Sequence, residues 1–219
     1  MTIAADIKRA TAELRERDPR WVVVKRLIVM QPVTHWLCGV YLRPSNWTKG
    51  SFYLSPTTHV LAAPSRGVRP GTEPTTGSEV RAPVERGAPE PSWNLAWPNC
   101  GKLLADVVLN DLLPRIEAAK TPDGMLSYLK RTQLKFTIAR QGAFNYALAG
   151  RRSEAMELAR MLVEDRLEEE DTRRRCERFM QILDSGQGPT NRLLRRLERM
   201  YADRYGVGKW WRWEPLVDA

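Results

Sequence analysis

The chain has 219 residues, of which 42% are apolar and 28% charged, and its formal net charge at pH 7 is +9. This composition is typical of a globular protein and excludes wholesale disorder. No apolar run approaches the roughly 20 residues that cross a bilayer, and charged residues interrupt any secretory signal, so we expect no membrane contact and a cytoplasmic location.

The N-terminal third predicts a helix followed by strands. Apolar residues recur at helical spacing in Ile3, Ile7, Ala10 and Leu14, and the dipeptide Asp18-Pro19 should end that helix. Three later stretches are rich in β-branched and aromatic residues and are separated by turn residues, which favours strands joined as hairpins. These stretches are Trp21 to Met30, Val33 to Leu42 and Ser51 to Ala63.

Residues 64–92 differ from both flanks. They contain six prolines and four glycines and almost no large apolar side chain, so they cannot bury enough surface to offset the entropy of ordering. We expect a flexible loop or linker here, and Trp93 to Trp97 could form a fourth strand.

The rest of the chain predicts helices. From Asn99 the apolar period changes from 2 to 3.6, Pro114 should kink or break the first helix, and Thr121-Pro122 should start the next. Further helices are expected at about 134–149, 153–167, 168–183 and 190–205.

The predicted fold class is therefore α+β, with an N-terminal helix and a small, mostly antiparallel sheet followed by a C-terminal helical region. We divide the chain into residues 1–63, the linker 64–92, and the helical region 93–219 with its aromatic, basic tail. The first and third parts could also share one core.

Residues 139–167 contain small side chains at positions where two helices would touch. Ala143, Ala155 and Ala159 are such residues, Gly150 stands at the turn and Tyr146 beside it. The segment resembles one unit of the tetratricopeptide repeat family, and the resemblance implies a helical hairpin and a peptide-binding groove. No second copy of the pattern occurs in the chain, so a plain helical hairpin is the alternative.

Two arginine clusters differ in their neighbours. Residues 173–175 are all arginine, and residues 169–171 supply acids four positions earlier, so we expect a self-neutralised surface. The last helix instead carries a basic stripe with little local compensation. The stripe consists of Arg192, Arg195, Arg196 and Arg199.

Beyond this helix, cations and indoles alternate in Lys209, Trp210, Trp211, Arg212 and Trp213. Such a tail can stack on bases or on a partner's side chains. Alternatively, its tryptophans dock into the core and leave the cations at the rim.

The two histidines, His35 and His59, form a further candidate site. If residues 33–42 and 51–63 form a hairpin centred on Trp47, the two imidazoles face each other, as an acid/base or metal pair would. A register slip of one residue would separate them. We see no further ligand for a metal.

The sequence contains no phosphate-binding glycine loop, dinucleotide fingerprint or nucleophile elbow. Three widely spaced cysteines, Cys38, Cys100 and Cys176, predict buried, reduced thiols. We therefore expect no cofactor and no metal, and a non-enzymatic module that binds a protein partner. Nucleic-acid binding through the basic stripe and tail is the alternative, and an enzyme based on carboxylates stays open.

Overall fold

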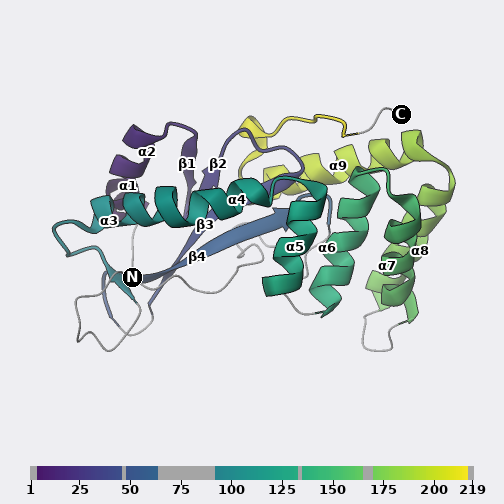
Figure 1. Ribbon diagram of the computed structural model, residues 1–219, viewed down its shortest axis with the longest axis horizontal. Coiled ribbons are helices and arrows are strands. Elements are labelled where there is room, and N and C mark those ends of the chain that lie inside the picture. The colour runs from purple at the N-terminus through teal and green to yellow at the C-terminus, as the bar shows by residue number, and fades with distance from the viewer. Residues whose placement is uncertain (1–3, 46–47, 64–91, 133–134, 165–169, 217–219) are drawn as a thin grey trace. The chain divides into compact units, whose positions relative to one another are not determined.

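The computed structural model describes residues 4–45, 48–63, 92–132, 135–164 and 170–216 (Figure 1). Its elements in chain order are α1 (Ala4–Ala10), α2 (Ala12–Arg17), β1 (Trp21–Val24), β2 (Leu27–Met30), β3 (Trp36–Pro44), β4 (Ser51–Val60), β5 (Trp93–Asn94), α3 (Cys100–Val107), η1 (Val108–Leu112), α4 (Leu113–Ala118), α5 (Pro122–Thr132), α6 (Lys135–Leu148), α7 (Arg152–Glu164), α8 (Glu170–Asp184), α9 (Gln187–Tyr205) and η2 (Gly208–Trp210). Two short helices precede the strands and the other helices follow them, and the predicted α+β class is confirmed.

The described chain forms two compact units. Unit 1 comprises the described residues of Met1–Val33, Leu37–Thr58 and Glu73–Ala118, and unit 2 those of Thr34–Trp36, His59–Thr72 and Ala119–Ala219. The predicted division into residues 1–63, 64–92 and 93–219 refers to domains that fold separately. The two compact units do not test this division, which stays a prediction. The predicted linker lies outside the described residues except for Ser92.

The described strands form one sheet in the order β1-β2-β3-β4-β5, and the pairs β1/β2, β2/β3 and β4/β5 are antiparallel. The prediction of a single strand from Trp21 to Met30 is wrong, because this stretch is a hairpin of β1 and β2. The chain turns at Lys25, whose φ is 56°. A lysine with a left-handed backbone conformation is uncommon, and the sequence has no glycine or asparagine that would predict a turn at this point.

The predicted N-terminal helix is present but interrupted at Thr11. The Thr11 hydroxyl donates a hydrogen bond to the Ile7 carbonyl, at 2.8 Å, and such back-bonding bends helices. Ile7, Ala10 and Leu14 are buried, as the apolar spacing predicts. α1 and α2 pack against α3 within unit 1.

Pro114 does not end the long helix of unit 1. A π-helical turn, η1, precedes this proline, and α4 continues to Ala118. The proline ring would clash with the carbonyl four residues earlier, and a wider turn relieves that clash.

Unit 2 contains the helices α5 to α9. The helices α5, α6, α7 and α8 stand side by side, and α9 runs across them (Figure 1). The Thr121 hydroxyl accepts a hydrogen bond from the Gly124 amide, at 3.0 Å, which confirms the predicted start of α5. Phe144 of α6 stacks on Phe179 of α8 with ring centroids 4.2 Å apart.

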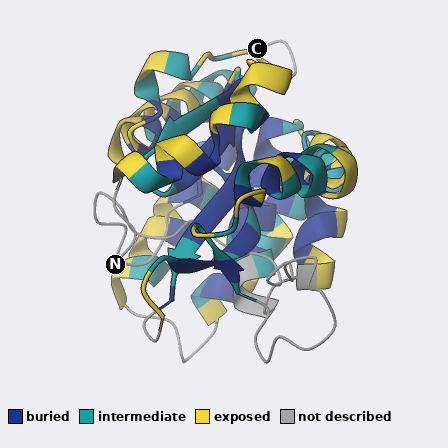
Figure 2. Ribbon diagram, turned by 90° about the vertical axis from the view of Figure 1, so that its left-hand side faces the viewer, coloured by how far each residue is buried: buried dark blue, intermediate teal, exposed yellow. Residues whose placement is uncertain are grey.

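The helices α7, α8 and α9 each carry a buried and an exposed face, whereas the described residues of α6 are buried or intermediate (Figure 2). All three cysteines are buried, as predicted. Within the described ranges, no helix is long and apolar enough to span a membrane.

One glycine in the sheet allows two strands to pair closely. Gly39 of β3 lies opposite Val29 of β2, and a Cβ atom at Gly39 would overlap the carbonyl oxygen of Ile28. We expect Gly39→Ala to lower the free energy of unfolding by about 2 kcal/mol, because a backbone atom cannot move aside as a side chain can. Urea denaturation measures the loss, and a change below about 0.5 kcal/mol would contradict the close packing.

Candidate functional site

A buried histidine–glutamate pair lies in unit 2. His35 precedes β3, and Glu198 lies on α9, 163 residues away. Their side chains are 1% and 0% exposed, and His35 Nδ1 is 2.8 Å from Glu198 Oε1. Buried ionisable groups need partners because desolvation disfavours their charged forms, and here each group is the other's partner.

The C-terminal segment, which we define as residues 207–216, contacts this pair directly. The His35 Nε2 atom is hydrogen-bonded to the backbone carbonyl of Glu214. The Trp211 indole donates a hydrogen bond to Glu198 Oε2, at 3.2 Å. Trp213 packs against the His35 ring in a T-shaped arrangement with centroids 5.0 Å apart. The pair therefore fixes the position of the segment that follows α9.

The neighbouring polar side chains are also satisfied within unit 2. The Trp36 indole forms a T-shaped contact with His35 and donates to Asn145 Oδ1, at 2.9 Å. The Asn145 amide donates in turn to the Pro122 carbonyl, at 2.7 Å. Gln141 of the same helix accepts a hydrogen bond from the Val60 amide, at 3.0 Å. These bonds orient the chain around His35.

Both members of the pair hold protons more tightly than usual. Burial alone would lower the pKa of His35, but Glu198 and the Glu214 carbonyl outweigh burial, and the pKa is raised above 6.5. Burial raises the pKa of Glu198 above 4.5, and His35 and Trp211 offset this only in part. In both cases the protonated state is favoured.

His59 is not the partner of His35. The Leu61 amide donates to the His35 carbonyl, and the Ser45 amide to the Ser51 carbonyl, both at 2.9 Å. These bonds place His35 opposite Leu61, so the predicted pairing with His59 is wrong by two residues. The hairpin is centred on position 48 and not on Trp47, which shifts the pairing by two residues.

His59 has a different environment. Its ring forms a T-shaped contact with Tyr205, with centroids 5.6 Å apart. Burial lowers its pKa to about 4, so this ring is neutral at pH 7. Among the described residues there is no group of three or more His, Cys, Asp or Glu side chains placed to hold a metal ion.

The predicted basic stripe lies on one exposed face of α9, which we call the arginine face (Arg192, Arg195, Arg196 and Arg199). Arg199 forms an ion pair with Asp203, at 3.2 Å, and lies over the Trp211 ring at 5.6 Å. For the other three arginines, no carboxylate of the described residues is within ion-pair distance. Three positive charges are therefore unneutralised.

The arginines of α8 are neutralised, in contrast. Glu170 pairs with Arg174 at 3.1 Å, and Asp171 pairs with Arg175. Glu170 also lies 3.6 Å from Arg173. The self-neutralised surface predicted for residues 173–175 is confirmed for these pairs.

The tail residues are placed as the docking alternative expects. Trp210, Trp211 and Trp213 are half-buried, whereas Lys209 and Arg212 are exposed. The Lys209 ammonium lies 4.1 Å from the centroid of the Trp210 ring. The indoles of Trp211 and Trp213 are engaged with the buried pair, so the tail presents cations to the outside.

The segment that resembles a tetratricopeptide unit forms a helical hairpin of α6 and α7. Ala143, Ala155 and Ala159 are buried, and Gly150 has a positive φ of 70° at the turn. The hairpin is confirmed, and the family resemblance and its groove stay predictions.

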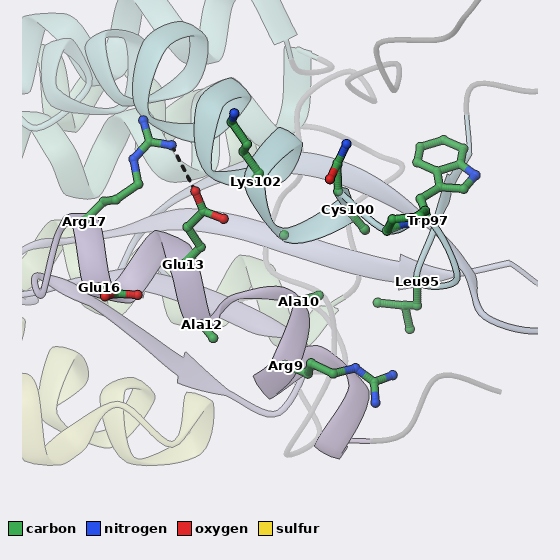
Figure 3. Close-up of a pocket in the computed structure, with 13 residues that line it drawn as sticks. Arg9, Ala10, Ala12, Glu13, Glu16, Arg17, Leu95, Trp97, Cys100 and Lys102 are labelled. Atoms are coloured by element: carbon green, nitrogen blue, oxygen red, sulfur yellow. Dashed lines mark ion pairs between the residues drawn. The ribbon is translucent and has the colours of Figure 1, made fainter.

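Unit 1 contains a cavity of about 790 Å³ between the first helices and the start of α3 (Figure 3). Its charges are largely paired, because Arg17 lies 3.7 Å from Glu13 and 2.6 Å from Asp106, and Arg9 lies 2.9 Å from Asp6. Cys100 lines the cavity, and burial raises the pKa of its thiol to about 11. It is thus a poor nucleophile, and we assign the cavity no function.

The sequence-based reasoning missed Glu198 as a site residue. A signal was present, because Glu198 lies four residues after the buried Leu194 and four before the buried Ala202. A carboxylate on the apolar face of a helix must have a buried partner.

No family model, no curated protein and no solved structure matches this chain.

Proposed function

We propose that this protein is a non-enzymatic interaction module that binds an acidic surface of a partner protein. The contact surface consists of the arginine face of α9 and the cations of the C-terminal segment, Lys209 and Arg212. In this proposal the protein acts in the bacterial cytoplasm as an accessory, adaptor or immunity-type protein, and its α6–α7 hairpin is similar to a tetratricopeptide unit.

One observation carries the proposal: Arg192, Arg195 and Arg196 are exposed on the same face without carboxylate partners in the described chain. Their charge is available to a partner, and arginine is enriched at interface hot spots. The neutralised arginines of α8 show that this sequence pairs such residues elsewhere.

Nucleic acid is the alternative partner. Proteins that bind single strands usually combine a basic groove with aromatic side chains on which bases stack. Here Trp211 and Trp213 are engaged with Glu198 and His35. This reduces the stacking surface, and the remaining cations favour an acidic protein surface.

The triple substitution R192A/R195A/R196A should weaken binding to a labelled poly-glutamate peptide at least about tenfold, which corresponds to 1.4 kcal/mol. The melting temperature should change little, because exposed arginines contribute little to stability. Fluorescence anisotropy at low salt measures the affinity, and a thermal melt tests the fold.

The matched control is R173A/R174A/R175A, which removes the same number of positive charges from the neutralised arginines of α8. Equal losses in the two triple variants would show that only net charge matters. Tighter binding to random single-stranded DNA than to poly-glutamate, with a steep salt dependence, would instead support the nucleic-acid alternative.

A further inference from the structure

The hydrogen bonds of His35 determine where protons lie. The Glu214 carbonyl can only accept, so His35 Nε2 carries a hydrogen atom and donates it. The contact between Nδ1 and Glu198 Oε1, at 2.8 Å, needs a second proton between two acceptors. With the C-terminal segment in place, the pair therefore holds two protons, as imidazolium with carboxylate or as imidazole with carboxylic acid.

Removal of one proton breaks this arrangement. A neutral imidazole has one N–H group, which can donate to Glu198 or to the Glu214 carbonyl but not to both. The other contact then joins two lone pairs, and the buried site carries an uncompensated negative charge. Trp211 is hydrogen-bonded to Glu198 and Trp213 packs against His35, so the docking of both tryptophans depends on the same proton.

We propose that the His35–Glu198 pair is a proton-dependent clamp, which holds the C-terminal segment on unit 2 when protonated and releases it when one proton is lost. Release moves the segment that carries Lys209 and Arg212 away from Arg199 of the arginine face, which lies over the Trp211 ring in the docked form. The clamp would thus regulate the basic surface, and this last step rests on the proposed function.

The surroundings of the pair set the direction of the pH dependence. The acids that face His35 are Glu198 from α9 and Glu214 from the C-terminal segment, and both raise its pKa, whereas Trp36 and Trp213 are neutral. Trp211, the other neighbour of Glu198, is also neutral, and the Arg199 guanidinium lies 5.6 Å from the centroid of the Trp211 ring.

The pKa of His35 is raised in the folded chain, so its protonated ring stabilises the docked segment. This stabilisation is fully present below the unfolded pKa of 6.5 and is lost as the pH rises through the raised pKa of the folded chain. The raised pKa of Glu198 acts in the same direction.

The test is ¹⁹F NMR of the full chain labelled with 5-fluorotryptophan, between about pH 5.5 and 9. We expect the Trp211 and Trp213 resonances, assigned with Trp211→Phe and Trp213→Phe, to move together with a one-proton midpoint above pH 6.5. Above the midpoint the docking equilibrium should fall about tenfold per pH unit. The Trp21 and Trp93 resonances, from buried side chains of unit 1, should stay constant. Movement of all resonances together would mean global unfolding and would overturn the clamp.

Glu198→Gln provides the decisive comparison. The glutamine amide can donate to the unprotonated Nδ1 while its oxygen accepts from Trp211, so the segment should stay docked at pH 9. Glu177→Gln, on the exposed face of α8, should titrate like the wild type. Unchanged wild-type resonances over the whole range, or a wild-type titration in Glu198→Gln, would refute the proposal.

The histidine ring resonances of the unaltered chain give a second measurement that needs no substitution. His35 should titrate above 6.5 and His59 near 4. Poly-glutamate binding should weaken with rising pH in the wild type but not in Glu198→Gln. Failure of this binding result alone would remove the regulatory step, whereas loss of the ¹⁹F titration would remove the clamp and leave the arginine face untouched.

Discussion

Glu198→Ala should lower the free energy of unfolding by about 3–5 kcal/mol, because breaking a buried ion pair leaves the other member without its partner. Glu198 is 0% exposed, and the substitution removes the acceptors of both His35 and the Trp211 indole. Urea denaturation at pH 6 measures the loss, since this pH lies below the raised pKa of His35.

Glu177→Ala is the matched control, because Glu177 is exposed on α8 and should cost less than about 0.5 kcal/mol. Glu198→Gln should cost far less than Glu198→Ala, since the amide keeps both hydrogen bonds. A loss below about 1 kcal/mol for Glu198→Ala would mean that water replaces the carboxylate, and the pair would then not be a buried unit.

Ala159→Arg should destabilise the protein by about 4 kcal/mol or more. Ala159 of α7 is 0% exposed, and α7 packs against both α6 and α8. An arginine there combines overpacking with the burial of an unpaired charge, two of the mechanisms behind large losses. Ala155→Arg should behave similarly, because Ala155 is also 0% exposed.

Glu157→Arg introduces the same side chain on the exposed face of the same helix and should change the melting temperature little. Arg151→Ala should also have a small effect, since its ion pairs with Asp123 and Glu154 are solvent-exposed. Similar melting temperatures for Ala159→Arg and Glu157→Arg would show that the small residues of α7 do not lie at a helix contact.

Local patterns predicted most of the helices but fewer details of the sheet. Features whose interacting residues are at most a few positions apart can be predicted from a short stretch of sequence. Examples are the Thr121 cap, the glycine turn at Gly150 and the ion pairs of α8. The turn at Lys25 was missed because nothing in its own side chain favours a positive φ. The π-helical turn before Pro114 was expected only as a kink or break.

The candidate site was predicted in part. The exposed arginine face follows from the spacing of its residues on one helix, and the structure places those residues as expected. The pairing of His35 with His59 failed because strand register depends on where the connecting turn is centred, and a shift of one residue in the centre moves the pairing by two. Two hydrogen bonds show that the register differs from the assumed one by two residues.

The sequence by itself determined the order of strands and helices, the amphipathic faces and the local neutralisation of charge, because each depends on residues within about one or two helical turns. Only the tertiary structure decided that His35 meets Glu198 across 163 residues, and that the tail docks on them. The physical reason is burial: a carboxylate and an imidazole removed from water need each other, but neither side chain reveals in sequence which distant partner the fold will supply.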